Sequence, residues 1–248
     1  MKTLSLIHGW GIGSCAWQTL TAQLGTNFKL QIIDLPGYGK NPGRNDDFLE
    51  TTQNIAKSIP PDSIVCGWSL GGIIAMQLAL LAPQRIAGLI VIAASPCFTK
   101  RDDWPQAQPP ELLSSFAQAT SKDPVGTLQR FNVLLNRGDS LARSTTRQLA
   151  QAMSTAPCPE RETLLRGLSW LRDIDLRPQI EQLNVPTLLI HGDMDQLMPL
   201  SAAQWLDEKL PASHLEIING AAHAPFINHP EQLARIIGDF CSHGLAKK

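Results

Sequence analysis

The sequence lacks any long apolar run and any excess of charge of one sign. None of its hydrophobic stretches approaches the roughly 20 residues that a membrane-spanning helix needs. Its 21 Lys and Arg residues nearly balance its 22 Asp and Glu residues, which leaves a net charge of −1. The overall charge therefore gives no support to nucleic-acid binding or membrane-surface binding. Hydrophobic residues make up 43% of the 248 residues and charged residues 17%, a composition that excludes general disorder.

Paired cysteines are also missing. The five cysteines are an odd number and form no C-x-x-C pair: Cys15, Cys66, Cys97, Cys158 and Cys241. The apolar run before His8 is too short for a signal peptide and has no small-residue cleavage site. We therefore expect a reduced, cytoplasmic protein. No metal-ligand spacing occurs, so we expect neither a metal nor a cofactor.

What the sequence does contain is an alternation of apolar strands and helices. Strands are expected at 4–7, 29–34, 86–93, 187–190 and 214–218, and in the apolar run before Ser69. Helices are expected at 17–24, 49–58, 201–210 and 230–241, and from Ser69 to near Pro83. The strands are continuously apolar, which is typical of a parallel sheet covered by helices on both faces. The fold class is therefore α/β.

The alternation stops between residues 97 and 175. This segment has no convincing strand but has four helical stretches, at 110–120, 124–136, 140–153 and 160–171. We predict that residues 97–175 form a helical cap, inserted into a core of residues 1–96 and 176–248. At this length the segment is not expected to fold as an independent domain.

The chain is organised around Ser69. It lies in Gly67-Trp68-Ser69-Leu70-Gly71, between a short apolar run and a helix-forming run. A Gly-x-Ser-x-Gly motif in that context is typical of a sharp strand-to-helix turn that exposes a nucleophilic serine. The following helix also directs free N–H groups towards a developing negative charge. A glycine-rich turn without catalytic function remains the alternative until partners for the serine are found.

The best candidate for the base is His223. It lies in a loop of small residues, 219–226, that follows the last strand and permits close approach to another element. His8 and His191 each stand at a strand end before a glycine, where a structural role is expected.

Two aspartates compete for the role of the orienting acid. Asp193 is close to the end of strand 187–190 and can cap its loop, whereas Asp195 lies deeper in the loop and can reach towards His223. We prefer Asp195. The chain order is then Ser, Asp, His, as in the α/β-hydrolase arrangement.

Along nearly its whole length the chain resembles the α/β-hydrolase superfamily. The resemblance rests on His8-Gly9-Trp10, Asp34-Leu35-Pro36-Gly37, the Ser69 turn, the Gly-Asp-x-Asp loop and the terminal histidine. Within that superfamily it is similar to the esterases that hydrolyse the methyl ester of pimeloyl-acyl-carrier protein in biotin synthesis. Those points of similarity are Leu-Ile-His-Gly-Trp-Gly, Gly-Trp-Ser-Leu-Gly-Gly, residues 94–98 and residues 221–227. The short N-terminal hairpin common in the superfamily is missing or reduced.

The resemblance implies a serine carboxylesterase that works through an acyl-enzyme. Ser69 would be the nucleophile, His223 the base and Asp195 the acid. The backbone N–H groups of Trp10 and Leu70 would bind the oxyanion. The acyl pocket would be lined by the Trp10 indole and by the helix residues Phe131, Asn132, Val133, Leu134 and Leu135. Ordinary core packing is the alternative for these apolar cap residues.

The resemblance also implies a partner, an acidic acyl-carrier protein bound by Arg130, Arg143 and Arg147. A solvated basic face is the alternative for these arginines. We expect a monomer. Other functions remain open: a general short-chain carboxylesterase, a carbon–carbon hydrolase or lyase on the same scaffold, and a non-catalytic ligand receptor.

Overall fold

The computed structural model describes residues 1–43 and 45–244. Its centre is a sheet of six strands in the order β2-β1-β3-β4-β5-β6, and every neighbouring pair is parallel. The strands are β1 (Thr3–Ile7), β2 (Lys29–Ile33), β3 (Ser63–Trp68), β4 (Ile86–Ile92), β5 (Thr187–Gly192) and β6 (Ser213–Ile218). Strands β3 and β5 are buried along their whole length, as their continuous apolar sequences predict. The predicted α/β class with a parallel sheet is confirmed.

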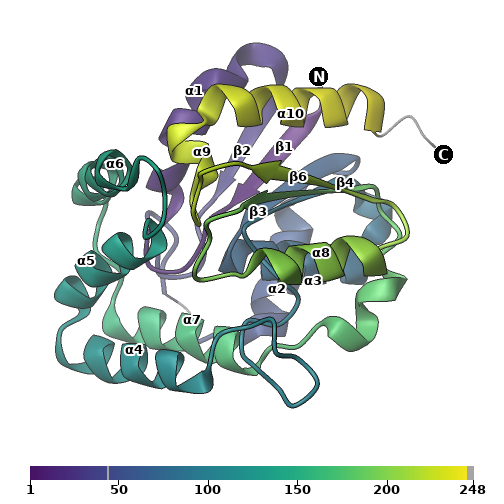
Figure 1. Ribbon diagram of the computed structural model, residues 1–248. Helices are drawn as coiled ribbons and strands as arrows, with labels where there is room; N and C mark the ends of the chain where they lie inside the picture. Colours follow the sequence, from purple (N-terminus) through teal and green to yellow (C-terminus); the bar gives the residue numbers. More distant parts are fainter. Residues whose placement is uncertain (44, 245–248) are drawn as a thin grey trace.

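Helices cover both faces of this sheet (Figure 1). One face carries α1 (Gln18–Leu24) and α10 (Pro230–His243), and the other carries α2 (Phe48–Ser58), α3 (Leu70–Leu81) and α8 (Leu200–Lys209). A four-residue helix, α9 (Pro225–Asn228), precedes α10, and short 3-10 helices lie at Ser14–Trp17, Gly25–Asn27, Pro83–Arg85 and Arg177–Gln182.

The strand order changes direction beside β1, because β2 and β3 lie on opposite sides of it. The loops at the carboxyl ends of β1 and β3 diverge at such a point, and ligands of open α/β sheets bind in the crevice they leave. His8 directly follows β1 and Ser69 directly follows β3. The topology therefore brings the two sequence motifs to one crevice.

Residues 97–175 contain four helices between β4 and β5. These are α4 (Pro110–Lys122), α5 (Pro124–Leu135), α6 (Ala142–Ser154) and α7 (Arg161–Asp173). An antiparallel bridge joins Cys97 to Asp175 at the two ends of the segment, and Figure 1 shows the helices beside the carboxyl ends of the strands. We call this segment the cap; its division from the core at residues 96 and 176 remains a proposal.

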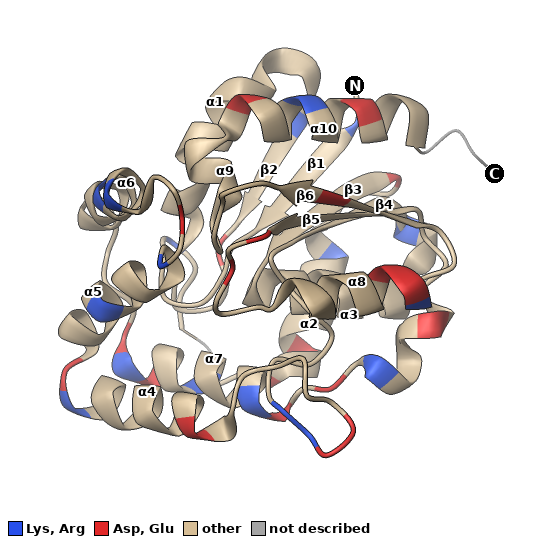
Figure 2. Ribbon diagram, viewed as in Figure 1, with Lys and Arg blue, Asp and Glu red and all other residues tan. Residues whose placement is uncertain are grey.

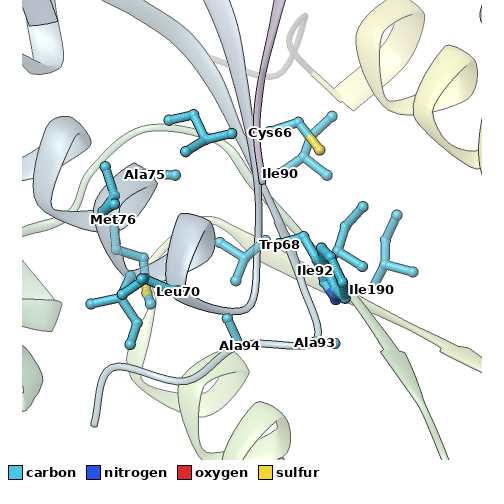
Figure 3. Close-up of a cluster of buried hydrophobic side chains, with 14 of the residues drawn as sticks. Cys66, Trp68, Leu70, Ala75, Met76, Ile90, Ile92, Ala93, Ala94 and Ile190 are labelled. Atoms are coloured by element: carbon cyan, nitrogen blue, oxygen red, sulfur yellow. The ribbon is translucent and has the colours of Figure 1, made fainter. Parts of the chain in front are cut away.

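The turn between β3 and α3 lies inside the apolar core. Trp68, Leu70 and Ala94 are at most 2% exposed, and Figure 3 shows them in a cluster that also contains Ile92 and Ile190. Dense packing around a turn leaves its backbone little freedom, so the core fixes the position of Ser69. No helix within the described residues is long and apolar enough to span a bilayer.

Candidate active site

Ser69 lies in a strained turn that the neighbouring glycines permit. Its φ of 55° and ψ of −120° fall where non-glycine residues are rare. A Cβ at Gly67 would lie 2.1 Å from the Gly71 carbonyl oxygen, and one at Gly71 would lie 2.3 Å from the Ile7 carbonyl oxygen. Because both obstacles are backbone atoms, these glycines have no simple substitute. The Ser69 N–H donates to the Ile92 carbonyl at 3.0 Å, which ties the turn to β4.

The loops after β5 and β6 bring Asp195 and His223 together. The His223 Nδ1 atom lies 2.8 Å from Asp195 Oδ2, and both side chains are at most 1% exposed. The other carboxylate oxygen, Oδ1, accepts the N–H groups of Leu197 and Met198 at 2.9 Å each. A carboxylate held in this way accepts the Nδ1–H of histidine, which leaves Nε2 as the acceptor of the neutral ring.

Asp193 has a different function in the same loop. Its Oδ1 accepts the Gly220 N–H at 2.7 Å, and it is exposed. It therefore connects the loop after β5 to the loop after β6, as expected of a loop-capping aspartate. The structure brings Asp195, not Asp193, to His223.

His8 and His191 have the structural environments that their positions predict. His8 Nε2 accepts the Leu35 N–H at 3.0 Å, so its Nδ1–H donates to the Gly9 carbonyl at 2.8 Å. Burial lowers the pKa of His8 from 6.5 to about 4. His191 Nε2 lies 2.8 Å from the Met198 carbonyl oxygen and 3.6 Å from Asp195 Oδ2. Burial also lowers the pKa of His191, and both rings are neutral at pH 7.

The loop after β1 lies directly against Ser69. An ideal Cβ on Gly9 would be 3.1 Å from the Cβ atom of Ser69. Trp10, the next residue, lines the same cavity as Ser69. Leu70 is the first residue of α3, a position whose N–H has no acceptor within its own helix. This placement is compatible with both backbone N–H groups binding an oxyanion, and that role stays a prediction.

A narrow, nearly filled apolar cavity contains both Ser69 and His223 in its wall. Around Ser69 the Trp10 ring meets the Phe131 ring edge-on with 4.8 Å between centroids, and the Phe116 ring at 5.9 Å. The Trp10 indole N–H donates to the Leu164 carbonyl at 2.8 Å, which fixes the ring against α7. The remaining lining residues are Phe98, Leu112, Leu113, Leu168, Leu171 and Leu197.

The prediction that residues 131–135 line the pocket together needs correction, since only Phe131 does so. Val133 is 60% exposed on the other side of α5. The Asn132 side chain donates to the Thr146 carbonyl at 2.9 Å, Leu134 is half-buried beside the core, and Leu135 belongs to the core. The physical reason is that a helix presents one stripe to a cavity, so consecutive residues diverge.

Sequence reasoning missed the contributions of α4 and α7 to this cavity. Leu112 and Phe116 lie four residues apart on α4, and Leu168 and Leu171 lie three apart on α7. Such i, i+3 and i, i+4 apolar pairs indicate the buried face of a helix. This spacing is the sequence signal that could have identified α4 and α7 as parts of the cavity wall.

The three cap arginines are exposed on α5 and α6. Arg130 Nη1 lies 3.9 Å from Asp123 Oδ2, and its Nη2 donates to Thr127 Oγ1 at 3.0 Å. Arg143 and Arg147 lie one turn apart on α6, and Figure 2 shows basic residues along both helices. Among residues 1–43 and 45–244, no acidic side chain lies within 4 Å of Arg143 or Arg147. These two charges are therefore available to a partner.

The chain as a whole matches a known family. Residues 2–230 match the family model described as the alpha/beta hydrolase fold. The chain belongs to the α/β-hydrolase family. The chain is 41% identical, over 228 residues, to the pimeloyl-[acyl-carrier protein] methyl ester esterase of Klebsiella pneumoniae. The match covers 92% of this chain and 88% of that protein. The protein of the same name from Aeromonas salmonicida is 39% identical over 240 residues, or 96% of this chain and 94% of the relative. The resemblance seen in the sequence motifs is confirmed.

Solved structures of more distant hydrolases share the fold. An esterase from Exiguobacterium antarcticum superimposes with a TM-score of 0.86 at 22% identity, covering 98% of this chain and 92% of that chain. A bromoperoxidase from Bacillus anthracis superimposes with a TM-score of 0.87 at 20% identity, covering 97% and 92%. An esterase and a bromoperoxidase fit this hydrolase equally well, so these two likenesses carry the fold and no particular reaction.

Proposed function

We propose that this hydrolase cleaves the methyl ester of pimeloyl-acyl-carrier protein, as a carboxylesterase of biotin synthesis. The observation that carries the proposal is the 2.8 Å contact of Asp195 with His223, whose ring shares the wall of one cavity with Ser69. Identity of about 40% with relatives named for this reaction, over more than 90% of the chain, supports the same substrate.

The first half of the reaction forms an acyl-enzyme. The Ser69 hydroxyl attacks the ester carbonyl carbon while His223 Nε2 takes its proton. Asp195 accepts the Nδ1–H and stabilises the imidazolium that results. The backbone N–H groups of Trp10 and Leu70 stabilise the oxyanion, at about 3–4 kcal/mol for one such donor. The imidazolium then protonates the leaving oxygen, and methanol departs.

The second half releases the free acid. Water enters the position that methanol has left, and His223 takes one of its protons as the oxygen attacks the acyl carbon. The tetrahedral intermediate collapses, Ser69 recovers its proton and the new carboxylate leaves. Neither half needs an electron acceptor or a second substrate besides water.

The shape of the cavity supports selection between the two acyl bonds of the substrate. The pimeloyl chain carries a methyl ester at one end and its bond to the carrier at the other. The apolar lining, with side chains such as Phe116 and Leu168, matches the chemistry of an apolar acyl chain, and the narrowness of the cavity excludes a folded carrier protein. The methyl end therefore reaches Ser69 while the carrier stays outside.

The carrier would dock on the cap through Arg130, Arg143 and Arg147, which are exposed on α5 and α6. An acidic carrier meets there a local basic surface that the overall charge of −1 does not provide. We propose that the enzyme acts as a monomer in the cytoplasm. The free state of all five cysteines supports a reducing compartment.

Mass spectrometry of the carrier tests the proposal directly. Methyl-pimeloyl carrier protein incubated with the enzyme should lose the mass of one methylene unit, and Ser69→Ala should leave it unchanged. Hydrolysis of the bond to the carrier would contradict the proposed selectivity. Equal kcat/KM for a small aryl acetate and for the carrier substrate would indicate a general short-chain carboxylesterase instead.

A further inference from the structure

The linker between α5 and α6, residues 136–141, touches both loops that carry the candidate acid and base. The Ser140 N–H donates to the Gly220 carbonyl at 2.9 Å, in the loop after β6. A Cβ on Gly138 would lie 3.0 Å from the Met194 carbonyl oxygen, in the loop after β5. The cap therefore contacts Asp195 and His223 through their loops, and not only through the wall of the cavity.

The linker also buries a carboxylate, that of Asp139, which is 7% exposed. Its Oδ2 accepts the Ala222 N–H at 3.2 Å, across 83 residues of sequence. Its Oδ1 accepts the N–H of Leu141 at 2.6 Å and the side-chain amide of Asn228 at 3.3 Å. Among the described residues no cationic side chain lies within 4 Å of it. Uncharged donors alone therefore compensate for the burial of this group.

Asp139 holds the backbone N–H of Ala222, the residue that immediately precedes His223. The next N–H, that of His223 itself, donates to the Leu135 carbonyl at the end of α5 at 3.2 Å. The His223 carbonyl accepts the Trp68 indole N–H at 2.7 Å. Three backbone groups of Ala222 and His223 are thus fixed, two by the cap and one by the Trp68 side chain at the end of β3. Fixing these backbone groups also fixes the direction of the Cα–Cβ bond of His223, and that bond sets where the imidazole ring can lie.

We propose that Asp139 is a positioning residue for His223, and that through it the cap aligns the ring with Ser69. This inference rests on the proposed Ser–His–Asp mechanism. Catalysis of this kind is sensitive to geometry, since a displacement of about 1 Å can cost on the order of a hundredfold in rate. Loss of the Asp139 carboxylate should therefore lower kcat in a protein that is still folded.

A purely structural role is the competing explanation, because the bond to Leu141 also supports the start of α6. The two explanations differ in what they change. A structural role lowers the melting temperature but leaves kcat per folded molecule unaltered. A positioning role lowers kcat well below the melting temperature, changes KM little and disturbs the His223–Asp195 hydrogen bond.

The test compares Asp139→Asn with a matched control, Asp123→Asn. Asp123 is also a cap carboxylate that accepts a backbone N–H, that of Gly126 at 2.9 Å, but it is exposed at the junction of α4 and α5, and its side chain contacts Gly126 and Arg130 of α5. Turnover of a small aryl acetate is measured for both, together with the far-downfield proton resonance of the His223 Nδ1–H. We expect kcat to fall at least about tenfold in Asp139→Asn, with that resonance broadened or shifted, and no change in Asp123→Asn.

Wild-type kcat and an unaltered resonance in folded Asp139→Asn would overturn the inference, as would equal losses in both variants. If Asp139→Asn does not fold, Gly138→Ala gives the answer. Its φ of 94° and its contact with Met194 mean that a methyl group displaces the same linker, and unchanged kcat there would again overturn the inference. Failure of the mechanism itself is distinguishable, because Ser69→Ala would then retain aryl acetate turnover.

Discussion

Three buried histidines, His8, His191 and His223, lie at the carboxyl ends of β1, β5 and β6, and their hydrogen-bond partners distinguish them. His8 connects the Leu35 N–H to the Gly9 carbonyl, and His191 contacts the Met198 carbonyl. Both use their ring nitrogens to hold loops. Only His223 combines a carboxylate at Nδ1 with a place in the cavity wall. At the residue scale, the partner of each nitrogen separates a structural ring from a candidate base.

The two aspartates after β5 give the first prediction. Asp195→Asn should lower kcat by several thousandfold, because an asparagine favours the wrong tautomer of His223 and cannot stabilise the imidazolium. Asp193→Asn should change kcat by less than about threefold, because Asp193 bonds only a loop N–H. Steady-state kinetics of the two variants on one aryl ester makes the comparison. A larger loss in Asp193→Asn would reverse the assignment.

The buried ring of His8 predicts how stability depends on pH. Because burial lowers its pKa from 6.5 to about 4, the unfolded chain binds a proton in this range that the folded chain excludes. The contribution is fully present above pH 6.5 and is lost as the pH falls towards 4. Between pH 7.5 and 4.5 the loss from His8 should be about 2–3 kcal/mol.

Urea unfolding of wild type and His8→Asn at these two pH values measures that loss. The variant should be less stable at pH 7.5 but should lose about 2–3 kcal/mol less on acidification. Burial of His191 adds a dependence of the same sign that both proteins share. Identical pH dependence in the two proteins would show that His8 does not titrate in this way.

The candidate residues differ in how far the sequence alone could reveal them. Ser69, Asp195 and His223 each occupy a short loop directly after an apolar strand, and the small residues around them are visible locally. Asp139 has no such local pattern, because its contact with Ala222 spans 83 residues. A contact of that kind depends on the packing of the cap, which no stretch of sequence specifies by itself.

At the scale of elements, the predicted helix starts agree with the structure to within one residue where a capping residue or a proline marks them in the sequence. Helix α2 begins at Phe48, one residue before the prediction, because Asp47 and Glu50 form a reciprocal capping box. Helix α5 begins at Pro124 as predicted. Helix α9 was missed, since four residues are too few to show a periodic pattern. The orientation of α5 was also missed, and Val133 on its outer side is the consequence.

The tight crossing of α3 over β1 gives an element-scale prediction. Gly71→Ala should destabilise the protein by at least about 2 kcal/mol, because its methyl group would meet the backbone oxygens of Ile7 and His8 at 2.3 and 2.5 Å. Gly238→Ala is the matched control in α10, where no atom lies within 4 Å of the added methyl group. It should stabilise the protein by about 0.5–1 kcal/mol. Chemical denaturation compares the two, and equal effects would contradict the crossing geometry.

At the scale of the whole molecule, charge is nearly balanced but unevenly placed. The net charge is −1, whereas Arg143 and Arg147 stand exposed on α6 without an acidic neighbour within 4 Å in the described part of the chain. Reversal of Arg130, Arg143 and Arg147 to Glu should lower kcat/KM for methyl-pimeloyl carrier protein at least about tenfold. Turnover of a small aryl acetate should change little, because that substrate has no acidic surface.

A charge-matched control replaces Lys29, Lys57 and Lys209, which are exposed outside the cap, by Glu. It should leave the carrier reaction nearly unaffected. Salt should weaken the wild-type preference, since the Debye length is about 8 Å at physiological ionic strength. Equal losses on both substrates would indicate a damaged cap, and equal losses in the two triple variants would indicate an effect of net charge alone.

The insertion of the cap between β4 and β5 also has a consequence for synthesis on the ribosome. These strands are neighbours in the sheet, although residues 93–186 separate them in the chain. A chain made from its N-terminus therefore exposes the edge of β4 while the four cap helices are added, and such an edge can pair with another nascent chain. Ser69 is translated before the cap, but Asp195 and His223 are translated after it. A ribosome-bound chain that stops before β6 already has its serine turn and still has no base to take the proton.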